Sequence, residues 1–445
     1  MQDAGIVRET GLWKRGVVWL LFLGPFFFLS YGFANWVSSQ RSGVGVIVFA
    51  WETYIPLLPW TIIPYWSIDL LYGLSFLLPR TRLEMDRHAL RLLTVQIICV
   101  ACFLLWPLTI SFVRPELSGM FGGMFDLLMG FDKPFNQAPS LHIALLVVLW
   151  TRYALYAPPR WQPLLHIWFA LIGLSVLTTW QHHFIDLPTG ALVGCFCLWL
   201  WPSTAPSPLS HAHLTDDPQR RRLACYYFLG AGLLTLLGFV IGGAALWLLW
   251  PAVSLLMVGL NYLLFGAQGF QKQANGRLSI GALGLFAPYL LGAWLNSRIW
   301  TRHAAHSVQV IDNVWLGRLP AADDLITAAA WVDLCAELPV APHDKAYRNF
   351  AVLDLTVPST QLCRSAGQAI ETLRQHGPVL VYCALGYSRS ATAIAAWLLL
   401  TQRCASTAEA LHCLRQARPA VVLTAAHLAA LQPLTEASEA SNACH

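Results

Sequence analysis

The sequence predicts an N-terminal all-α bundle of about nine membrane spans, followed by a C-terminal α/β domain with a central sheet flanked by helices. Composition is the first reason. Of the 445 residues, 56% are hydrophobic and 11% are charged, where an average soluble chain has about 25% charged residues. The second is that apolar runs near the ~20 residues a bilayer requires recur as far as residue 297. The third is that these runs then stop, and 11 basic and 11 acidic residues follow.

Nine apolar runs account for the membrane part. We place them at 17–37, 59–79, 89–112, 140–157, 163–181, 184–202, 223–242, 244–265 and 278–297. The first run has no small-residue cleavage site, so we interpret it as a span rather than a signal peptide. The stretch 44–58 is also apolar, but Glu52, Pro56 and Pro59 interrupt it. We therefore expect a re-entrant or interfacial segment there.

The distribution of positive charge predicts the orientation of the spans. If all nine runs cross, 14 Lys and Arg residues of the membrane part lie on one face and three on the other. Cytoplasmic loops carry the excess of Lys and Arg. We therefore expect the N-terminus in the cytoplasm of a bacterial cell, with the protein in the inner membrane. The net charge of +5 is scattered, so a bilayer is the expected partner and nucleic acid is not.

The domain boundaries follow from shifts in composition. Residues 1–202 form a six-span membrane domain, and the Pro- and Ser-rich stretch 203–222 is a linker. Three additional spans follow in 223–297. Residues 298–445 have the length of an ordinary soluble domain.

The first candidate site combines two histidines and an aspartate on the face with few positive charges. His142 begins the fourth run, while His182 and Asp186 are four residues apart, which on a helix places them on one face. A neutral imidazole can attack phosphorus while a carboxylate fixes its tautomer, and a second histidine can protonate the leaving oxygen. The alternative is that these side chains cap helices, but ionisable groups at membrane depth are usually functional.

Two segments of this site carry a family resemblance. Pro139-Ser140-Leu141-His142 and His182-x3-Asp186 resemble the second and third motifs of the type 2 phosphatidic acid phosphatase superfamily, over about residues 50–202. The resemblance implies His182 as a nucleophile that forms a phosphohistidine, Asp186 as its orienting partner and His142 as the general acid. It also implies that Ser140 and Arg114 contact the substrate.

The same comparison shows departures. Arg114-Pro115 matches the end of the first motif, but Pro107 stands where the family has Lys, and Val176 stands where the third motif has Arg. A sequence without these two cations resembles the inositolphosphorylceramide and sphingomyelin synthase branch of the superfamily. These enzymes transfer a phospho-headgroup to an alcohol. The sequence is therefore compatible with either hydrolase or transferase activity at this site. His183 is the neighbouring alternative nucleophile, without the three-residue spacing to Asp186.

The second candidate site is a cysteine in a phosphate loop. Val379–Tyr382 is expected to be a buried strand, Cys383 ends it, and a helix is expected from Ser388 onward. Backbone N–H groups at such a strand–loop–helix junction bind a phosphate, and the same field lowers the pKa of the thiol. Arg389 can hold two phosphate oxygens.

This pattern, Cys-x5-Arg-Ser, resembles the dual-specificity branch of the cysteine phosphatases over about residues 308–430, and implies an α/β cysteine-phosphatase domain. The implied roles are nucleophile for Cys383, phosphate binding for Arg389, help in thiolate departure for Ser390, loop contacts to substrate for Gly386 and Ser388, and general acid for Asp354. Asp344 and Asp333 are alternative acids. The loop residues between Cys383 and Ser388 carry no cation, which favours a substrate with one phosphate.

Together the two resemblances imply a bifunctional membrane phospholipid phosphatase or phosphotransferase that requires no metal and no cofactor. The alternative is a membrane-tethered protein tyrosine or dual-specificity phosphatase whose membrane half is a non-catalytic anchor or lipid-binding module. If all nine runs cross, the C-terminal domain shares the outer face with the histidine site. If one of the last three is re-entrant, this domain is cytoplasmic, which better suits its six cysteines.

Overall fold

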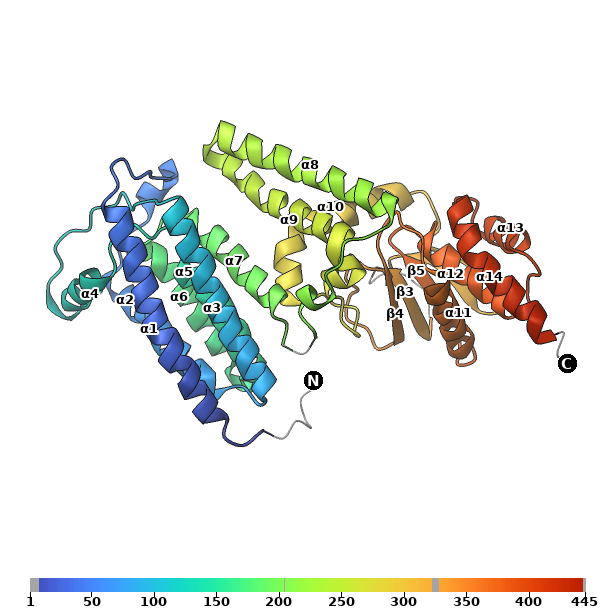
Figure 1. Cartoon of the computed structure of the whole chain (residues 1–445), viewed down its shortest axis with the longest axis horizontal. Helices are drawn as coiled ribbons and strands as arrows, with labels where there is room; N and C mark the ends of the chain where they lie inside the picture. The colour runs from blue at the N-terminus through green and yellow to red at the C-terminus, as the bar shows by residue number, and fades with distance from the viewer. Residues whose placement is uncertain (1–7, 204, 322–327, 443–445) are drawn as a thin grey trace. The chain divides into compact units, whose positions relative to one another are not determined.

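The computed structural model describes residues 8–203, 205–321 and 328–442, and side chains as far as residue 435. Its contacts divide the chain into two compact units (Figure 1). Unit 1 consists of Met1–Ser210 and Leu237–Trp247, and unit 2 of His211–Leu236 and Leu248–His445. The predicted domain boundaries stay predictions.

Unit 1 is helical. Its helices are α1 (Leu12–Ser39), α2 (Ile62–Leu74), α3 (Arg82–Leu105), α4 (Gly119–Phe131), α5 (Leu141–Tyr156), α6 (Gln162–Thr178) and α7 (Asp186–Leu200). A buried apolar cluster joins α1, α2, α3, α5, α6 and α7. Close approach of α5 and α7 depends on Gly190, because a Cβ there would lie 2.5 Å from the carbonyl oxygen of Ser140. This contact brings the start of α5 to the start of α7.

Several helices of unit 1 are shorter than the apolar runs that predicted them. The predicted run 89–112 extends beyond the helix it contains, because α3 ends at Leu105. Helices α2, α5 and α7 have only 13, 16 and 15 residues. The stretch 44–58 contains the short 3-10 helix Ala50–Tyr54. An unexpected helix, α4, lies in a predicted loop. Over the described residues, six helices are long and apolar enough to cross a membrane, which fits a membrane protein but does not confirm nine spans.

Unit 2 begins with three apolar helices, α8 (Pro218–Ile241), α9 (Leu249–Leu260) and α10 (Ile280–Thr301). The last five residues of α8 cluster with unit 1. After α9 the chain continues through a π-helical turn, Asn261–Phe265, and a 3-10 turn, Gly266–Phe270. Large apolar side chains on the outer faces of α8 and α10 are exposed, including Leu229, Leu233, Leu291 and Ile299. These faces have the character of lipid-facing surface.

The rest of unit 2 is an α/β domain with a mixed five-stranded sheet. Its strands are β1 (Ser307–Ile311), β2 (Val314–Arg318), β3 (Ala330–Cys335), β4 (Ala346–Val352) and β5 (Val379–Cys383), in the order β1-β2-β5-β3-β4. The β1–β2 pair is antiparallel and the other pairs are parallel. Four helices, α11 (Thr360–Arg374), α12 (Arg389–Leu400), α13 (Thr407–Ala417) and α14 (Ala425–Asn442), gather at this end of the chain (Figure 1).

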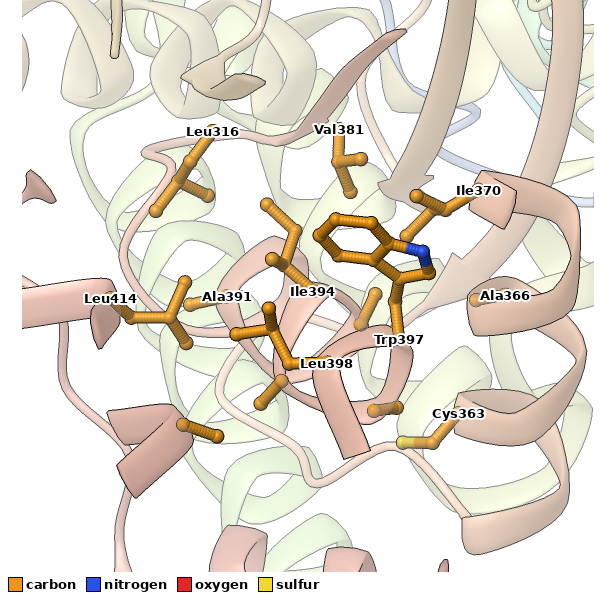
Figure 2. Packing of buried hydrophobic residues seen from close by; sticks show 14 of the residues in the cluster. Leu316, Cys363, Ala366, Ile370, Val381, Ala391, Ile394, Trp397, Leu398 and Leu414 are labelled. Carbon is orange, nitrogen blue, oxygen red and sulfur yellow. The ribbon is translucent and has the colours of Figure 1, made fainter. Parts of the chain in front are cut away.

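The central strand β5 is buried on both faces, as a run of apolar residues in a parallel sheet predicts. Val381 and Cys383 point into the cluster formed with α11 to α14, while Leu380 and Tyr382 point into a second cluster that includes Ala293 of α10. Figure 2 shows the Trp397 ring of α12 beside Val381 and Ile370. The carboxyl end of β5 is therefore fixed from both sides.

Candidate active site

The loop after β5 is shaped by one glycine. Cys383 is the last residue of β5 and α12 begins at Arg389, so five residues join them. Gly386 has φ of +75°, and a Cβ at this position would lie 2.6 Å from the carbonyl oxygen of Gly317. Its N–H donates to the Cys383 Sγ over 3.3 Å. The glycine thus permits the turn that directs a backbone donor at the sulfur.

The surroundings of Cys383 favour a thiolate. Burial alone would raise the pKa of this thiol, but Arg389 and hydrogen bonds from Ser390 and Gly386 lower it below its ordinary value. The Ser390 hydroxyl donates to the sulfur over 3.3 Å. In contrast, burial raises the pKa of the other described cysteines of this domain, which are Cys335, Cys363, Cys404 and Cys413.

Arg389 is held in place by acidic groups from two other segments. Its guanidinium donates to both carboxylate oxygens of Glu337, over 2.8 and 2.9 Å, and to the carbonyl oxygen of Val352 over 2.8 Å. A further ion pair of 2.9 Å joins it to Asp354 Oδ1. Arg389 and Glu337 are both buried, so this bidentate pair fixes the plane of the Arg389 guanidinium.

Of the three aspartates considered as acids, Asp354 contacts Arg389. It follows β4, and burial together with the nearby charge of Glu337 raises the pKa of its carboxyl group against the opposing effect of Arg389. Asp333 is buried instead with Lys272 and Tyr347, at 2.5 and 2.6 Å. Asp344 is 90% exposed and pairs with Lys345. Position and raised pKa both make Asp354 suited to donate a proton near Arg389.

The loop containing Asp354 is held by the apolar helices of the same unit. The Tyr262 hydroxyl, in the turn after α9, donates to the carbonyl oxygen of Asp354 over 2.9 Å. Gln219 of α8 donates to the carbonyl oxygen of Leu355, a residue with φ of +56°. Ser297 of α10 donates to the carbonyl oxygen of Ala384 in the phosphate loop, over 2.5 Å.

The remaining predicted loop residue, Ser388, lies beside a histidine. Its hydroxyl is 3.0 Å from Nε2 of His427, whose Nδ1 contacts the hydroxyl of Thr424 at 2.8 Å. Arg418 donates to the carbonyl oxygen of Leu385 over 3.3 Å. These contacts tie the phosphate loop to the segment that contains Arg418 and His427.

In unit 1 the structure brings together His182, Asp186 and Ser140. The Nδ1 atom of His182 lies 3.1 Å from Asp186 Oδ2, and its Nε2 atom lies 3.1 Å from the Ser140 hydroxyl. The expectation that one helix face would create this contact is wrong, because α6 ends at Thr178 and α7 begins at Asp186. A turn between the two helices makes the contact instead.

The second histidine of this candidate site, His142, lies in the first turn of α5, as predicted. Its ring stacks on that of Tyr65 with centroids 4.2 Å apart. Among the described residues its Nε2 atom and Asp186 Oδ1 have no hydrogen-bond partner. Arg114 donates to the carbonyl oxygen of Thr179 over 3.1 Å and lies over the Phe125 ring.

The structure distinguishes His183 from His182. His183 Nε2 accepts from the backbone N–H of Ser111 over 3.1 Å, so its proton is on Nδ1, which lies 3.0 Å from Glu52 Oε2. Both histidines therefore have partners on both ring nitrogens, but Nε2 faces a backbone N–H in His183 and a side-chain hydroxyl in His182. The Glu52 side chain is fully buried and also accepts from the N–H of Phe184.

Sequence reasoning missed the two acidic residues that hold these sites, Glu52 and Glu337. Each offered a signal, since Glu52 interrupts the apolar stretch 44–58 and Glu337 comes two residues after the end of β3, a mostly apolar strand. A carboxylate in apolar surroundings is expensive to bury without a partner. The partner itself was not visible from local sequence.

Comparison with known proteins bears on the C-terminal domain. Residues 335–436 match the family model described as dual specificity phosphatase, catalytic domain. Similar solved structures include PTPMT1 in complex with PI(5)P (19% identity, 31% of this chain and 99% of that chain, TM-score 0.29) and Tk-PTP in the active form (28%, 30%, 98%, 0.28). Human DUSP28 is similar with 25% identity (30% of this chain, 99% of that chain, TM-score 0.28).

No curated protein matches the chain, and no family model shows the phosphatidic acid phosphatase resemblance of unit 1. The family match covers the strand end that carries Cys383, together with Arg389 and Asp354. The C-terminal part of this chain is therefore a dual-specificity phosphatase catalytic domain, a hydrolase of phosphoric esters.

Proposed function

We propose that this chain is a bifunctional phospholipid phosphatase or phosphotransferase of the membrane. The C-terminal site removes phosphate from a lipid phosphomonoester, and the His182 site cleaves or transfers a lipid phospho-group. The observation that carries the proposal is the position of Asp354, which pairs with Arg389, accepts a hydrogen bond from Tyr262 in the turn after α9, and lines a cavity together with residues of α8, α9 and α10. A phosphatase site held by such helices suits a substrate that resides in a bilayer.

At the C-terminal site the reaction proceeds through a phosphocysteine. Arg389 and the loop N–H groups bind the phosphate, and the Cys383 thiolate attacks phosphorus. The S–P bond forms as the bond from phosphorus to the leaving oxygen breaks, and Asp354 gives its proton to that oxygen. Water then attacks the phosphocysteine and passes its proton to Asp354. Free phosphate leaves and the thiolate returns, assisted by the Ser390 hydroxyl.

At the membrane site His182 is the proposed nucleophile. With its Nδ1 proton directed at Asp186, its Nε2 lone pair attacks phosphorus and forms a phosphohistidine. Asp186 stabilises the cation that develops on the ring, and His142 protonates the leaving oxygen. Water or a lipid alcohol then accepts the phospho-group. Nε2 of His183 accepts from a backbone N–H, which cannot rotate away, whereas Nε2 of His182 faces the Ser140 hydroxyl, which can; this difference supports His182 as the nucleophile.

The proposal is tested by phosphate release from a panel of lipid phosphomonoesters, using detergent-purified protein. We expect Cys383→Ser to abolish release and His182→Ala to leave it intact. Loss of release in His182→Ala with full release in Cys383→Ser would instead assign the monoesterase to the membrane site. The membrane site is tested separately, by transfer or cleavage of a labelled lipid phosphodiester, which His182→Ala should abolish.

A phosphotyrosine peptide provides the comparison with the rival function. If wild-type protein hydrolyses the peptide far faster than any lipid phosphate, and Cys383→Ser abolishes this, the chain is a tethered protein phosphatase. The lipid proposal requires the opposite order of kcat/KM values.

A further inference from the structure

We propose that a cavity among α8, α9 and α10 binds the apolar part of the lipid substrate while its phosphate occupies the Cys383 loop. This inference rests on the proposed lipid phosphatase function and adds where the leaving alcohol lies. The cavity has a volume of about 340 Å³, which is within the range of ~300–1,000 Å³ common for small-molecule sites.

The lining of this cavity is mostly apolar and ends at the catalytic acid. It consists of Tyr227 of α8, Pro251 and Leu255 of α9, Pro288, Tyr289, Gly292, Ala293 and Asn296 of α10, and Asp354. The α10 residues recur at the spacing of a single helix face. All of these residues belong to unit 2, in which α8 to α10 adjoin the phosphatase domain (Figure 1).

The position of Asp354 determines which part of a substrate enters the cavity. Its carboxylate pairs with Arg389, which faces the phosphate, and it also forms part of the cavity wall. A general acid must lie within hydrogen-bond reach of the leaving oxygen. The group attached to that oxygen therefore lies on the cavity side, while the phosphate lies on the Cys383 side.

The side chains that line the cavity suit the part of a lipid where the headgroup joins the acyl chains. Beside Asp354, Tyr227 is near Tyr262 and Tyr289, with ring centroids 5.3 and 5.9 Å apart. Tyrosines with one polar and one apolar end are suited to the region where a headgroup joins its chains. Beyond them, Pro251, Leu255 and Gly292 provide an apolar surface, and the outer faces of α8 and α10 carry exposed Leu and Ile.

Gly292 offers a specific way to fill the cavity. A Cβ at this position would have no atom within 4 Å, so an added side chain would start in open space. Gly232 of α8 has the same property and lies outside the cavity lining. Gly292→Phe and Gly232→Phe are thus a matched pair, and Leu255→Trp fills the cavity from a second helix.

The experiment measures kcat/KM for a long-chain phosphatidic acid in mixed micelles and for p-nitrophenyl phosphate, and compares their ratio between variants. We expect Gly292→Phe and Leu255→Trp to lower the ratio of lipid to small substrate about tenfold, the size of effect that altered pocket volume produces. Gly232→Phe should keep the wild-type ratio. With monoalkyl phosphates of increasing length, the rise of kcat/KM should stop earlier in Gly292→Phe than in wild type.

An unaltered ratio in both cavity variants would overturn this inference, even if both rates fell together. Equal loss of the ratio in Gly232→Phe would also overturn it, because the effect would then not depend on the cavity. A failure of the proposed function would give a different result from a failure of this inference, because lipid turnover would then persist in Cys383→Ser.

Discussion

At the scale of single residues, two carboxylates with opposite tasks surround Arg389. Glu337 is buried and binds the guanidinium through both oxygens, and Arg389 lowers the pKa of its carboxyl group despite burial. Asp354 contacts the same guanidinium once, and the net shift of its pKa is upward. A carboxylate that stays ionised can position Arg389, while one that holds a proton can donate it.

The pH dependence of the C-terminal activity follows from these shifts. Below the lowered pKa of Cys383 the thiolate is lost, and above the raised pKa of Asp354 the acid is lost. We therefore expect a bell-shaped profile of kcat/KM for an alkyl phosphate. Asp354→Asn should remove the alkaline limb and lower the rate by about 10²-fold or more. Asp344→Asn, at an exposed position, is the control, and an alkaline limb that survives in Asp354→Asn would contradict the assignment.

A second prediction concerns Glu337. Replacement by Gln removes the charge that orients Arg389, and we expect kcat/KM to fall roughly 10²-fold, as a displacement of a catalytic group by about 1 Å produces. Glu371 provides a control, because it pairs with Arg374 and Arg403 in a more exposed setting. Glu371→Gln should change activity little. Equal activity of the two variants would show that Glu337 does not position Arg389.

At the scale of elements, both sites depend on how segments distant in sequence are clamped together. The acid loop after β4 is fixed by Tyr262 and Gln219 from the apolar helices. Ser297 of α10 similarly holds the phosphate loop at Ala384. In unit 1, Gly190 lets α7 approach α5. The apolar helices thus hold the loops that carry the candidate catalytic residues.

Tyr262 is predicted to be a positioning residue for Asp354. Tyr262→Phe removes the hydrogen bond to the Asp354 carbonyl oxygen, and the freer loop should lower kcat about tenfold. KM for p-nitrophenyl phosphate should change little, and the alkaline limb of the pH profile should shift. Tyr226→Phe is the control, because Tyr226 on α8 is exposed. A fall in folded protein without a shift of the pH profile would indicate a purely structural role.

The close approach of α5 and α7 can be tested through stability. In Gly190→Ala the new methyl group would meet the Ser140 carbonyl oxygen, so the helices must separate. We expect a loss of about 1–3 kcal/mol, as overpacking in a tight core commonly costs, and a lower Tm in detergent. Gly173→Ala is the matched control, since its Cβ would meet the end of the Leu146 side chain at 3.2 Å and no backbone atom within 4 Å. An equal Tm for both variants would argue against a tight contact at Gly190.

At the scale of the whole molecule, the chain folds into two compact units that contain six helices of membrane-spanning character among the described residues. The distribution of Lys and Arg predicts the orientation of unit 1 independently of the exact number of spans beyond it. The side on which the C-terminal domain lies depends on how many of α8 to α10 cross.

Orientation can be measured with a reporter enzyme that is active only outside the cytoplasm. Fused after Lys133 the reporter should be active, and fused after Arg160 it should be inactive, because the second loop belongs to the positively charged face. The reverse pattern would overturn the predicted topology. Fusion at the C-terminus then determines the side of the phosphatase domain: activity there requires that α8, α9 and α10 all cross.

The sequence by itself determined the chemical groups and their local order. Cys383 and Arg389 flank one five-residue loop, and one short turn joins His182 to Asp186, so their spacing encodes their proximity. It also indicated the change from apolar helices to an α/β domain. Helix ends were less predictable, since apolar composition in 89–112 continues where α3 has already ended.

Only the tertiary structure decided which distant residues complete the sites. Glu52 reaches His183 from 131 positions away, Tyr262 reaches Asp354 from 92, and Glu337 reaches Arg389 from 52. Such contacts arise from packing and strand order, which a local pattern does not contain. The physical reason is that a buried carboxylate must find a partner, but the partner is whichever donor the fold brings within reach.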